Sequence, residues 1–194
     1  MSESDPHDPR RVLLGVSGGI AAYKAAELAR LLMKGSPDDG STKCDVRVVM
    51  TAAAREFIAP LTFESLTGNP VSTEMFSPRT EPAHAHIELA RWAEVLVVAP
   101  ATAGILAKMA LGLADDLLST TALACESPVV VAPAMNSAMW AHPAVEANYA
   151  ALRMRGAAFV GPAKGDLACG ETGPGRMSEP AEIASAVREV LAKA

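Results

Sequence analysis

Residues 11–34 read RVLLGVSGGIAAYKAAELARLLMK, and this stretch decides the fold. The first six residues are rich in leucine and valine, which predicts a buried strand over Arg11–Val16. Ser17-Gly18-Gly19 ends that strand, and apolar residues then recur at helical spacing over Ile20–Lys34. A buried strand that turns through glycines into a helix is typical of a parallel sheet covered by helices.

The same alternation continues along the chain. Further strands are predicted at Val46–Met50, Val95–Ala99, Val129–Ala132 and Ala157–Val160. Helices are predicted from Ala52 onward and at Ala103–Leu111, Asp115–Ala124, Val145–Arg155 and Pro180–Lys193. We therefore predict an α/β fold with a doubly wound parallel sheet. It forms one domain over residues 11–194, preceded by a disordered tail at residues 1–10.

Composition excludes several classes of protein. The chain has 194 residues, half of them apolar, which is enough for one sizeable core. A net charge of −5 lacks the basic footprint of a nucleic-acid binder. The polar N-terminus is no secretory signal, and the longest uncharged apolar stretch, Val95–Ala107, is too short to span a bilayer. Three cysteines without a C-x-x-C pair favour a reducing compartment, so we expect a cytoplasmic protein.

Ligands of doubly wound sheets bind beyond the carboxyl ends of the strands. At the first such end, the Ser17–Ile20 turn offers glycines for close backbone approach and helix N–H groups for an anion. The turn lacks the G-x-G-x-x-G pattern, and Asp45 precedes the second strand rather than ending it. A mononucleotide is therefore favoured over a dinucleotide. Thr51, after the second strand, could cap a helix or bind a phosphate.

Two more strand ends carry candidate residues. Pro100-Ala101-Thr102-Ala103-Gly104 has small side chains that leave room for a flat ligand, although tight helix–sheet packing is an alternative. Pro133-Ala134-Met135-Asn136 ends the fourth strand, and Asn136 could bind a carboxylate or an amide or be a turn residue. His84 and His86 show no third ligand, so no metal site is predicted. Asp115-Asp116 is best explained as a helix cap.

Residues 167–177 read LACGETGPGRM. Glycine inside a regular element costs backbone entropy, so this composition predicts neither a helix nor a strand. It predicts a mobile loop that carries one thiol, Cys169, and such a loop can close over a substrate. A surface loop with an inert cysteine is the alternative.

Five motifs occur in order along the chain. They are His86-Ile87-Glu88-Leu89, Ala99-Pro100-Ala101-Thr102-Ala103, Ala114-Asp115-Asp116-Leu117-Leu118, Pro133-Ala134-Met135-Asn136-Ser137-Ala138-Met139-Trp140 and Leu167-Ala168-Cys169-Gly170. With them the chain resembles the homo-oligomeric flavin-containing cysteine decarboxylases from about Arg11 to Leu191. Within that family it is most similar to the decarboxylases that act on phosphopantothenoylcysteine.

The resemblance implies a flavodoxin-like, Rossmann-type fold that binds FMN and assembles as a trimer or as four trimers, with the flavin near a subunit interface. The residues implied to hold FMN are Gly18, Gly19, Ile20, Thr51, Thr102, Ala103, Gly104, Ile105 and Ala134. His86 would be the catalytic histidine and Cys169 the proton donor on a lid. Asn136 and Met135 would bind the substrate. Gly104 stands where many relatives carry asparagine, which leaves its backbone N–H for the flavin.

The implied reaction is FMN-dependent decarboxylation of a cysteinyl carboxylate, from 4′-phospho-N-pantothenoylcysteine to 4′-phosphopantetheine in coenzyme A biosynthesis. A cysteine amide has no electron sink of its own, and the flavin supplies one by oxidising the thiol carbon. Many bacterial relatives are fused to the synthetase that makes this substrate, so a separate synthetase is an expected partner.

Three alternatives remain at this point. A relative could act on the C-terminal cysteine of a ribosomal peptide and stop at the enethiol, which needs no lid thiol; Cys169 favours the coenzyme A reaction. A non-catalytic flavoprotein that regulates a partner is a second alternative. The flavin prenyltransferases share the fold and are a third.

Overall fold

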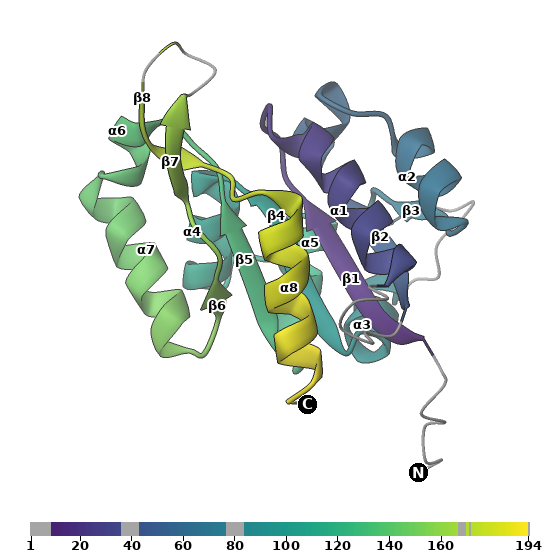
Figure 1. Cartoon of the computed structure of the whole chain (residues 1–194). Coiled ribbons are helices and arrows are strands. Elements are labelled where there is room, and N and C mark those ends of the chain that lie inside the picture. Colours follow the sequence, from purple (N-terminus) through teal and green to yellow (C-terminus); the bar gives the residue numbers. More distant parts are fainter. Residues whose placement is uncertain (1–8, 36–42, 77–83, 167–169, 171, 194) are drawn as a thin grey trace.

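The computed structural model is built on a sheet of six parallel strands in the order β3-β2-β1-β4-β5-β6 (Figure 1). These strands are β1 (Arg10–Val16), β2 (Cys44–Met50), β3 (Val71–Ser72), β4 (Val95–Ala101), β5 (Val129–Pro133) and β6 (Ala158–Phe159). The structure describes residues 9–35, 43–76, 84–166, 170 and 172–193.

The strand order makes the sheet doubly wound, as predicted. The chain starts at β1, moves outward through β2 to β3, returns to β4 beside β1, and then moves outward the other way. Without the two-residue edge strand β3, the order is that of flavodoxin. The winding therefore reverses between β1 and β4, where folds of this kind open a crevice at the carboxyl ends of the strands.

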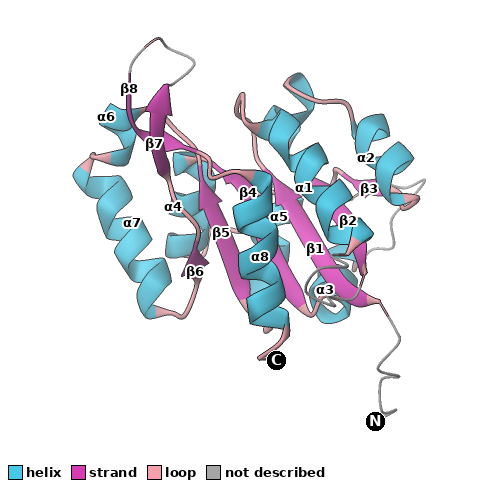
Figure 2. Ribbon diagram, in the orientation of Figure 1, coloured by secondary structure: helices cyan, strands magenta, loops and turns pink. Residues whose placement is uncertain are grey.

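Helices cover both faces of the sheet (Figure 2). They are α1 (Ala22–Lys34), η1 (Ala52–Glu56), α2 (Pro60–Thr67), α3 (Ala85–Trp92), α4 (Ala103–Leu111), α5 (Leu117–Ala124), α6 (Ser137–Trp140), α7 (Pro143–Met154) and α8 (Pro180–Leu191). One core lies under α1, α2 and α8, and the other under α3, α4, α5 and α7. In the described part of the chain, none of these helices has the length and apolar character needed to cross a membrane.

Alternation along β1 explains how one strand serves both cores. Val12 and Leu14 are fully buried against α1 and α8, whereas Leu13 is fully buried on the opposite face. Gly15 also faces the second core, where an added Cβ would collide with the Leu118 side chain of α5. Burying a side chain of this size contributes roughly 1.5–3 kcal/mol, so a strand apolar throughout is stable only with both faces covered.

Several element boundaries differ from the prediction. β1 begins at Arg10, and residues 1–8 of the predicted tail lie outside the described residues. β4 continues through Pro100 to Ala101, past a shift in its pairing with β5. The helix predicted from Ala52 is a short 3₁₀ helix, η1, in which the Thr51 hydroxyl accepts the Ala54 N–H. The prediction did not include α2, α3, α6, β3 or β7.

The prediction that residues 167–177 avoid regular structure was wrong for the second half of the segment. Thr172–Arg176 forms β8, which pairs with β7 (Ala163–Asp166) in an antiparallel hairpin outside the main sheet. Its glycines are needed for contact: an added Cβ on Gly173 would collide with the Ser137 side chain, and one on Gly175 with the Met135 carbonyl oxygen. Residues 167–169 and 171, including Cys169, lie outside the described residues.

Asp116 caps helix α5, as predicted for the Asp115-Asp116 pair. Its Oδ1 accepts the Ser119 backbone N–H at 2.8 Å, and its Oδ2 accepts a hydrogen bond from Lys108 Nζ at 2.6 Å. Burial alone would raise the pKa of Asp116, but the hydrogen bonds from Lys108 and Ser119 outweigh it and hold this pKa below its ordinary value. The cap therefore also fixes the end of α4, which carries Lys108, against the start of α5.

We expect Asp116→Ala to lower the free energy of unfolding by about 1 kcal/mol at neutral pH, because it removes both the cap and the partner of Lys108. A carboxyl whose pKa is lowered by folding contributes stability above its unfolded pKa and loses it as the pH falls through the folded value. The difference between Asp116→Ala and the wild type should therefore shrink below about pH 4. Urea unfolding at several pH values measures it.

Asp115→Ala is the matched control. Asp115 also contacts Lys108 Nζ, at 2.7 Å, but its side chain is 64% exposed, against 26% for Asp116. An exposed ion pair contributes little, so this variant should lose only a few tenths of a kcal/mol. Equal losses in the two variants would contradict the role given to the cap.

Candidate active site

A pocket of about 510 Å³ opens at the carboxyl ends of β1, β4 and β5, between the reversal of the sheet and the β7–β8 hairpin. This volume is in the usual range for cofactor and small-molecule sites. The residues predicted from sequence that line it are Gly18, Gly19, Ile20, Thr102, Ala103, Gly104, Ala134, Met135 and Asn136. The predicted flavin and substrate residues from three separate strand ends therefore come together.

Other predicted residues do not line this pocket in a single chain. Thr51 uses its hydroxyl to cap η1, accepting the Ala54 N–H at 3.2 Å. Ile105 lies in the first turn of α4 with its side chain buried in the second core. His86 lies in the first turn of α3, and Cys169 lies outside the described residues.

The Ser17 hydroxyl joins the two strand ends that flank the reversal. Its Oγ donates to the Pro100 carbonyl at 2.7 Å and accepts the Thr102 backbone N–H at 3.1 Å. Ser17 is almost fully buried, so these bonds also satisfy a hydroxyl that is shielded from water. The β1–α1 turn and the β4–α4 turn are thereby held as one floor for the pocket. Ser17 was noticed only as part of the turn, because the sequence does not reveal its partners.

The glycines of the first turn have two different functions. An added Cβ on Gly18 would collide with backbone atoms of Ala53, so Gly18 is required by packing against η1. An added Cβ on Gly19 would make only an ordinary contact with Thr102, and one on Gly104 would meet almost open space. The prediction attributed the turn's glycines to ligand approach, and for Gly18 the structure adds a structural reason.

The wall made by Ala134, Met135 and Asn136 is fixed from both sides. The Ala134 N–H donates to the Ala101 carbonyl and the Met135 N–H to the Gly175 carbonyl, each at 2.9 Å. Asn136 caps α6 by accepting the Ala138 N–H at 2.8 Å, which orients its side-chain amide beside the pocket. The β7–β8 hairpin thus positions the segment predicted to bind substrate.

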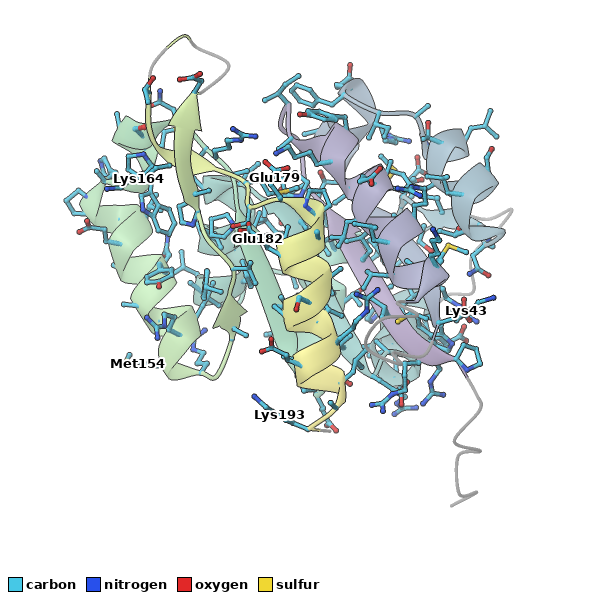
Figure 3. The ribbon with its side chains drawn as sticks, in the orientation of Figure 1. Lys43, Met154, Lys164, Glu179, Glu182 and Lys193 are labelled. Atoms are coloured by element: carbon cyan, nitrogen blue, oxygen red, sulfur yellow. The ribbon has the colours of Figure 1, made fainter. Side chains whose placement is uncertain are left out.

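Charged side chains at one end of the pocket were not found from the sequence. Lys24 and Arg176 line the pocket, and both donate to the same atom, Glu179 Oε1, at 2.9 and 2.6 Å. The hydrogen bond from Lys24, helped by Arg176, holds the pKa of Glu179 below its ordinary value. Glu179 is the N-cap residue of α8 and lies at the start of that helix (Figure 3). The sequence contains one signal for this cluster: Lys24 is a cation on the otherwise apolar face of α1.

His86 combines a half-buried ring with an unsatisfied nitrogen. Its Nδ1 is shielded from solvent and has no hydrogen-bond partner among the described residues. A buried ring nitrogen without a partner is uncommon and calls for an explanation. The described residues also contain no group of three or more His, Cys, Asp or Glu side chains able to hold a metal ion.

The pocket fits a flat mononucleotide better than a dinucleotide. Thr102, Gly104 and Ala134 give one wall of small side chains, and the turn after β1 leads into the N-terminus of α1. Asp45 was predicted to precede the second strand, but it is the second residue of β2. It still lies at the amino end of that strand, away from the pocket at the carboxyl ends. There it accepts a hydrogen bond from Asn69 Nδ2 at 2.8 Å. No acidic residue at the end of β2 is thus available for a ribose of a dinucleotide.

Comparisons with known proteins agree with this geometry. A family model described as Flavoprotein matches residues 1–192. The coenzyme A biosynthesis bifunctional protein CoaBC of Vibrio parahaemolyticus is 49% identical over 174 residues, which cover 90% of this chain and 42% of that protein. The chain therefore spans less than half the length of this curated relative.

Solved structures give full-length matches. A cysteine-to-serine mutant of a PPC decarboxylase complexed with pantothenoylaminoethenethiol has a TM-score of 0.79 and 35% identity, covering 94% of this chain and 98% of that one. The FMN-dependent cysteine decarboxylase SpaF has a TM-score of 0.77 and 36% identity, covering 95% and 96%.

We expect Gly175→Ala to detach the hairpin from Met135, because Gly175 has φ 138° and its Cβ would collide with the Met135 carbonyl. Exchange of the Met135 amide hydrogen, which is bonded to the Gly175 carbonyl, should become about tenfold faster or more. Gly68→Ala is the control, since Gly68 has φ 70° but open space around it. That variant should lose about 1 kcal/mol of stability through backbone strain alone. Unchanged Met135 exchange in Gly175→Ala would contradict the anchoring role.

Proposed function

The chain belongs to the Flavoprotein family, and from this membership and the geometry of its pocket we propose that it is an FMN-dependent carboxy-lyase acting on a cysteinyl carboxylate. The substrate we propose is PPC, 4′-phospho-N-pantothenoylcysteine, with 4′-phosphopantetheine and carbon dioxide as products. The observation that carries this proposal is the convergence of the first turn, the β4–α4 turn and Ala134–Asn136 on one pocket. Curated and solved relatives named for coenzyme A biosynthesis and PPC decarboxylation support it.

The residues present fit the flavin. Gly18–Ile20 and the N-terminus of α1 would hold its phosphate, and Thr102–Gly104 with Ala134 would line its ring. Gly104 would contribute its backbone N–H. Bound FMN would supply the electron sink that a cysteine amide lacks. Thr51 and Ile105 do not line the pocket in a single chain. They remain proposed FMN contacts, through atoms outside that lining.

The substrate side of the pocket is proposed from Asn136 and Met135. The side-chain amide of Asn136 would bind the cysteinyl carboxylate, and its orientation is fixed by the α6 cap. Cys169 follows β7 in the chain and would donate the proton that completes the saturated thiol product. A thiol is suited to this step because its ordinary pKa lies close enough to neutral pH for it to give up a proton.

His86 is proposed as the catalytic histidine of a homo-oligomer. It does not line the pocket of its own chain, and its buried Nδ1 has no partner among the residues described. The first observation is explained if a second copy places its His86 beside the pocket. A trimer, or four trimers, is the assembly we propose, and a synthetase that makes PPC is the proposed partner activity.

The function is tested with purified protein, PPC and exclusion of air. We expect a yellow protein whose flavin spectrum bleaches only transiently, and a product that has lost carbon dioxide alone by mass spectrometry. The matched variant Cys169→Ser should instead form an enethiol with two fewer hydrogens, at most one per flavin, and its flavin spectrum should stay bleached because no air is present to reoxidise it. A wild type that removes carbon dioxide and two hydrogens from a peptide ending in cysteine, and leaves PPC unchanged, would overturn the proposal in favour of peptide decarboxylation. A colourless protein that does not bind FMN would overturn both.

The second copy is tested by mixing inactive subunits. His86→Asn and Asn136→Ala should each lose most activity alone. Co-expressed, they should regain about a quarter of the wild-type rate, because random pairing places an intact His86 beside an intact Asn136 in that fraction of sites. No recovery in mixed oligomers that bind FMN normally would show that His86 acts within its own chain or not at all.

A further inference from the structure

One end of the pocket carries two cations that share a single acceptor. Lys24 of α1 and Arg176 of β8 both donate to Glu179 Oε1, at 2.9 and 2.6 Å. Two positive groups and one negative group leave this cluster with a net charge of +1. The cluster joins three elements that are distant in sequence, and it faces the pocket through Lys24 and Arg176.

The two cations retain hydrogen-bonding capacity. An ammonium group has three N–H donors and a guanidinium has five. Glu179 Oε1 is the acceptor that the described residues provide to either group. The Lys24 side chain is only 10% exposed, whereas that of Glu179 is 54% exposed. A buried ammonium with one acceptor gains more from a second anion than an exposed cation does, because little water competes for it.

Asp166, the other charged residue that lines the pocket, does not cancel this charge. It lies at the far end of the hairpin, where it accepts a hydrogen bond from the Thr172 hydroxyl at 2.8 Å. The Arg176 guanidinium is bonded to Glu179 instead, through Nη2 at 2.6 Å. The pocket is therefore lined by two cations that share Glu179 and by one carboxylate that is bonded to Thr172.

We propose that Lys24 and Arg176 form an anion subsite that binds a phosphate monoester of the substrate, with Glu179 as the internal counter-ion that positions both cations. This inference rests on the proposed function and defines its substrate class: a cysteinyl compound with a phosphate at the end remote from the cysteine. A planar guanidinium and a compact ammonium together match the oxygens of a phosphate.

The flavin phosphate is the other source of the same chemistry. We place it at the N–H groups that begin α1; the Lys24 side chain belongs to the same first turn, as the third residue of the helix. Arg176, in contrast, belongs to the hairpin that covers the substrate side of the pocket and holds Met135. We therefore assign the anion at this end to the substrate.

The test is calorimetric binding of 4′-phosphopantetheine and of pantetheine to the FMN-loaded protein. The wild type should bind the phosphorylated compound more tightly. Arg176→Met and Lys24→Met should each lose about tenfold or more of that affinity and leave pantetheine binding unchanged. Glu179→Gln keeps an oxygen acceptor but removes the opposing charge, so it should bind the phosphorylated compound several-fold more tightly.

Lys164→Met is the matched control, because it removes one positive charge from the same hairpin. Lys164 is exposed, does not line the pocket, and lies on the other side of the hairpin from Glu179 (Figure 3). Losses in Arg176→Met and Lys24→Met no larger than in Lys164→Met would overturn the subsite. A loss in Glu179→Gln as large as in Arg176→Met would overturn the counter-ion role.

Two further measurements separate this inference from the function on which it rests. Dissociation constants for FMN and riboflavin in each variant identify the source of the anion: a selective loss of FMN affinity would assign the subsite to the cofactor and overturn the proposal. If the protein binds 4′-phosphopantetheine through Lys24 and Arg176 but does not decarboxylate PPC, the subsite stands and the proposed function fails.

Discussion

The hydrogen bonds of the Ser17 hydroxyl are the interaction on which the pocket depends. β1 and β4 are neighbouring strands, and the helices that follow them pack on opposite faces of the sheet. A crevice therefore opens at the carboxyl ends of these two strands. The Ser17 hydroxyl links the two strand ends at the base of this crevice, by donating to the Pro100 carbonyl and accepting the Thr102 N–H. Because both turns are held by one buried side chain, the floor of the pocket is rigid before any ligand binds.

The rest of the pocket is built onto this floor by close backbone contacts. Gly18 lies against the backbone of Ala53, and Gly175 lies against the carbonyl of Met135, at distances that no other residue allows. Each glycine connects an element outside the β1–β4 pair to the site: η1 at one place and the hairpin at the other. The glycines of this chain therefore act more through packing between backbone segments than through flexibility.

Much of the fold could be predicted because its strands are apolar on both faces. Five of the six sheet strands were located from apolar runs, since a strand covered by helices on both sides needs such a run. β3 has only two residues, and β8 is rich in glycine and proline, so neither has the pattern of a strand. The residues of the pocket floor were predicted because each strand end can be recognised from the short stretch of sequence around it. The Lys24–Glu179–Arg176 cluster was not, since its members meet only through the packing of α1, α8 and the hairpin.

The arrangement of charge also bears on how substrate and protein recognise each other. A cysteinyl substrate carries a carboxylate at the reacting end, and binding it requires donors in a pocket that is otherwise mostly apolar. In the proposed reaction, Asn136 would provide them without adding charge beside the group that leaves as carbon dioxide. A cation there would stabilise the carboxylate and oppose its loss, since only interactions stronger in the transition state accelerate a reaction. Lys24 and Arg176 are both held by Glu179, so in the proposed complex their charge would serve the phosphate rather than the carboxylate that departs.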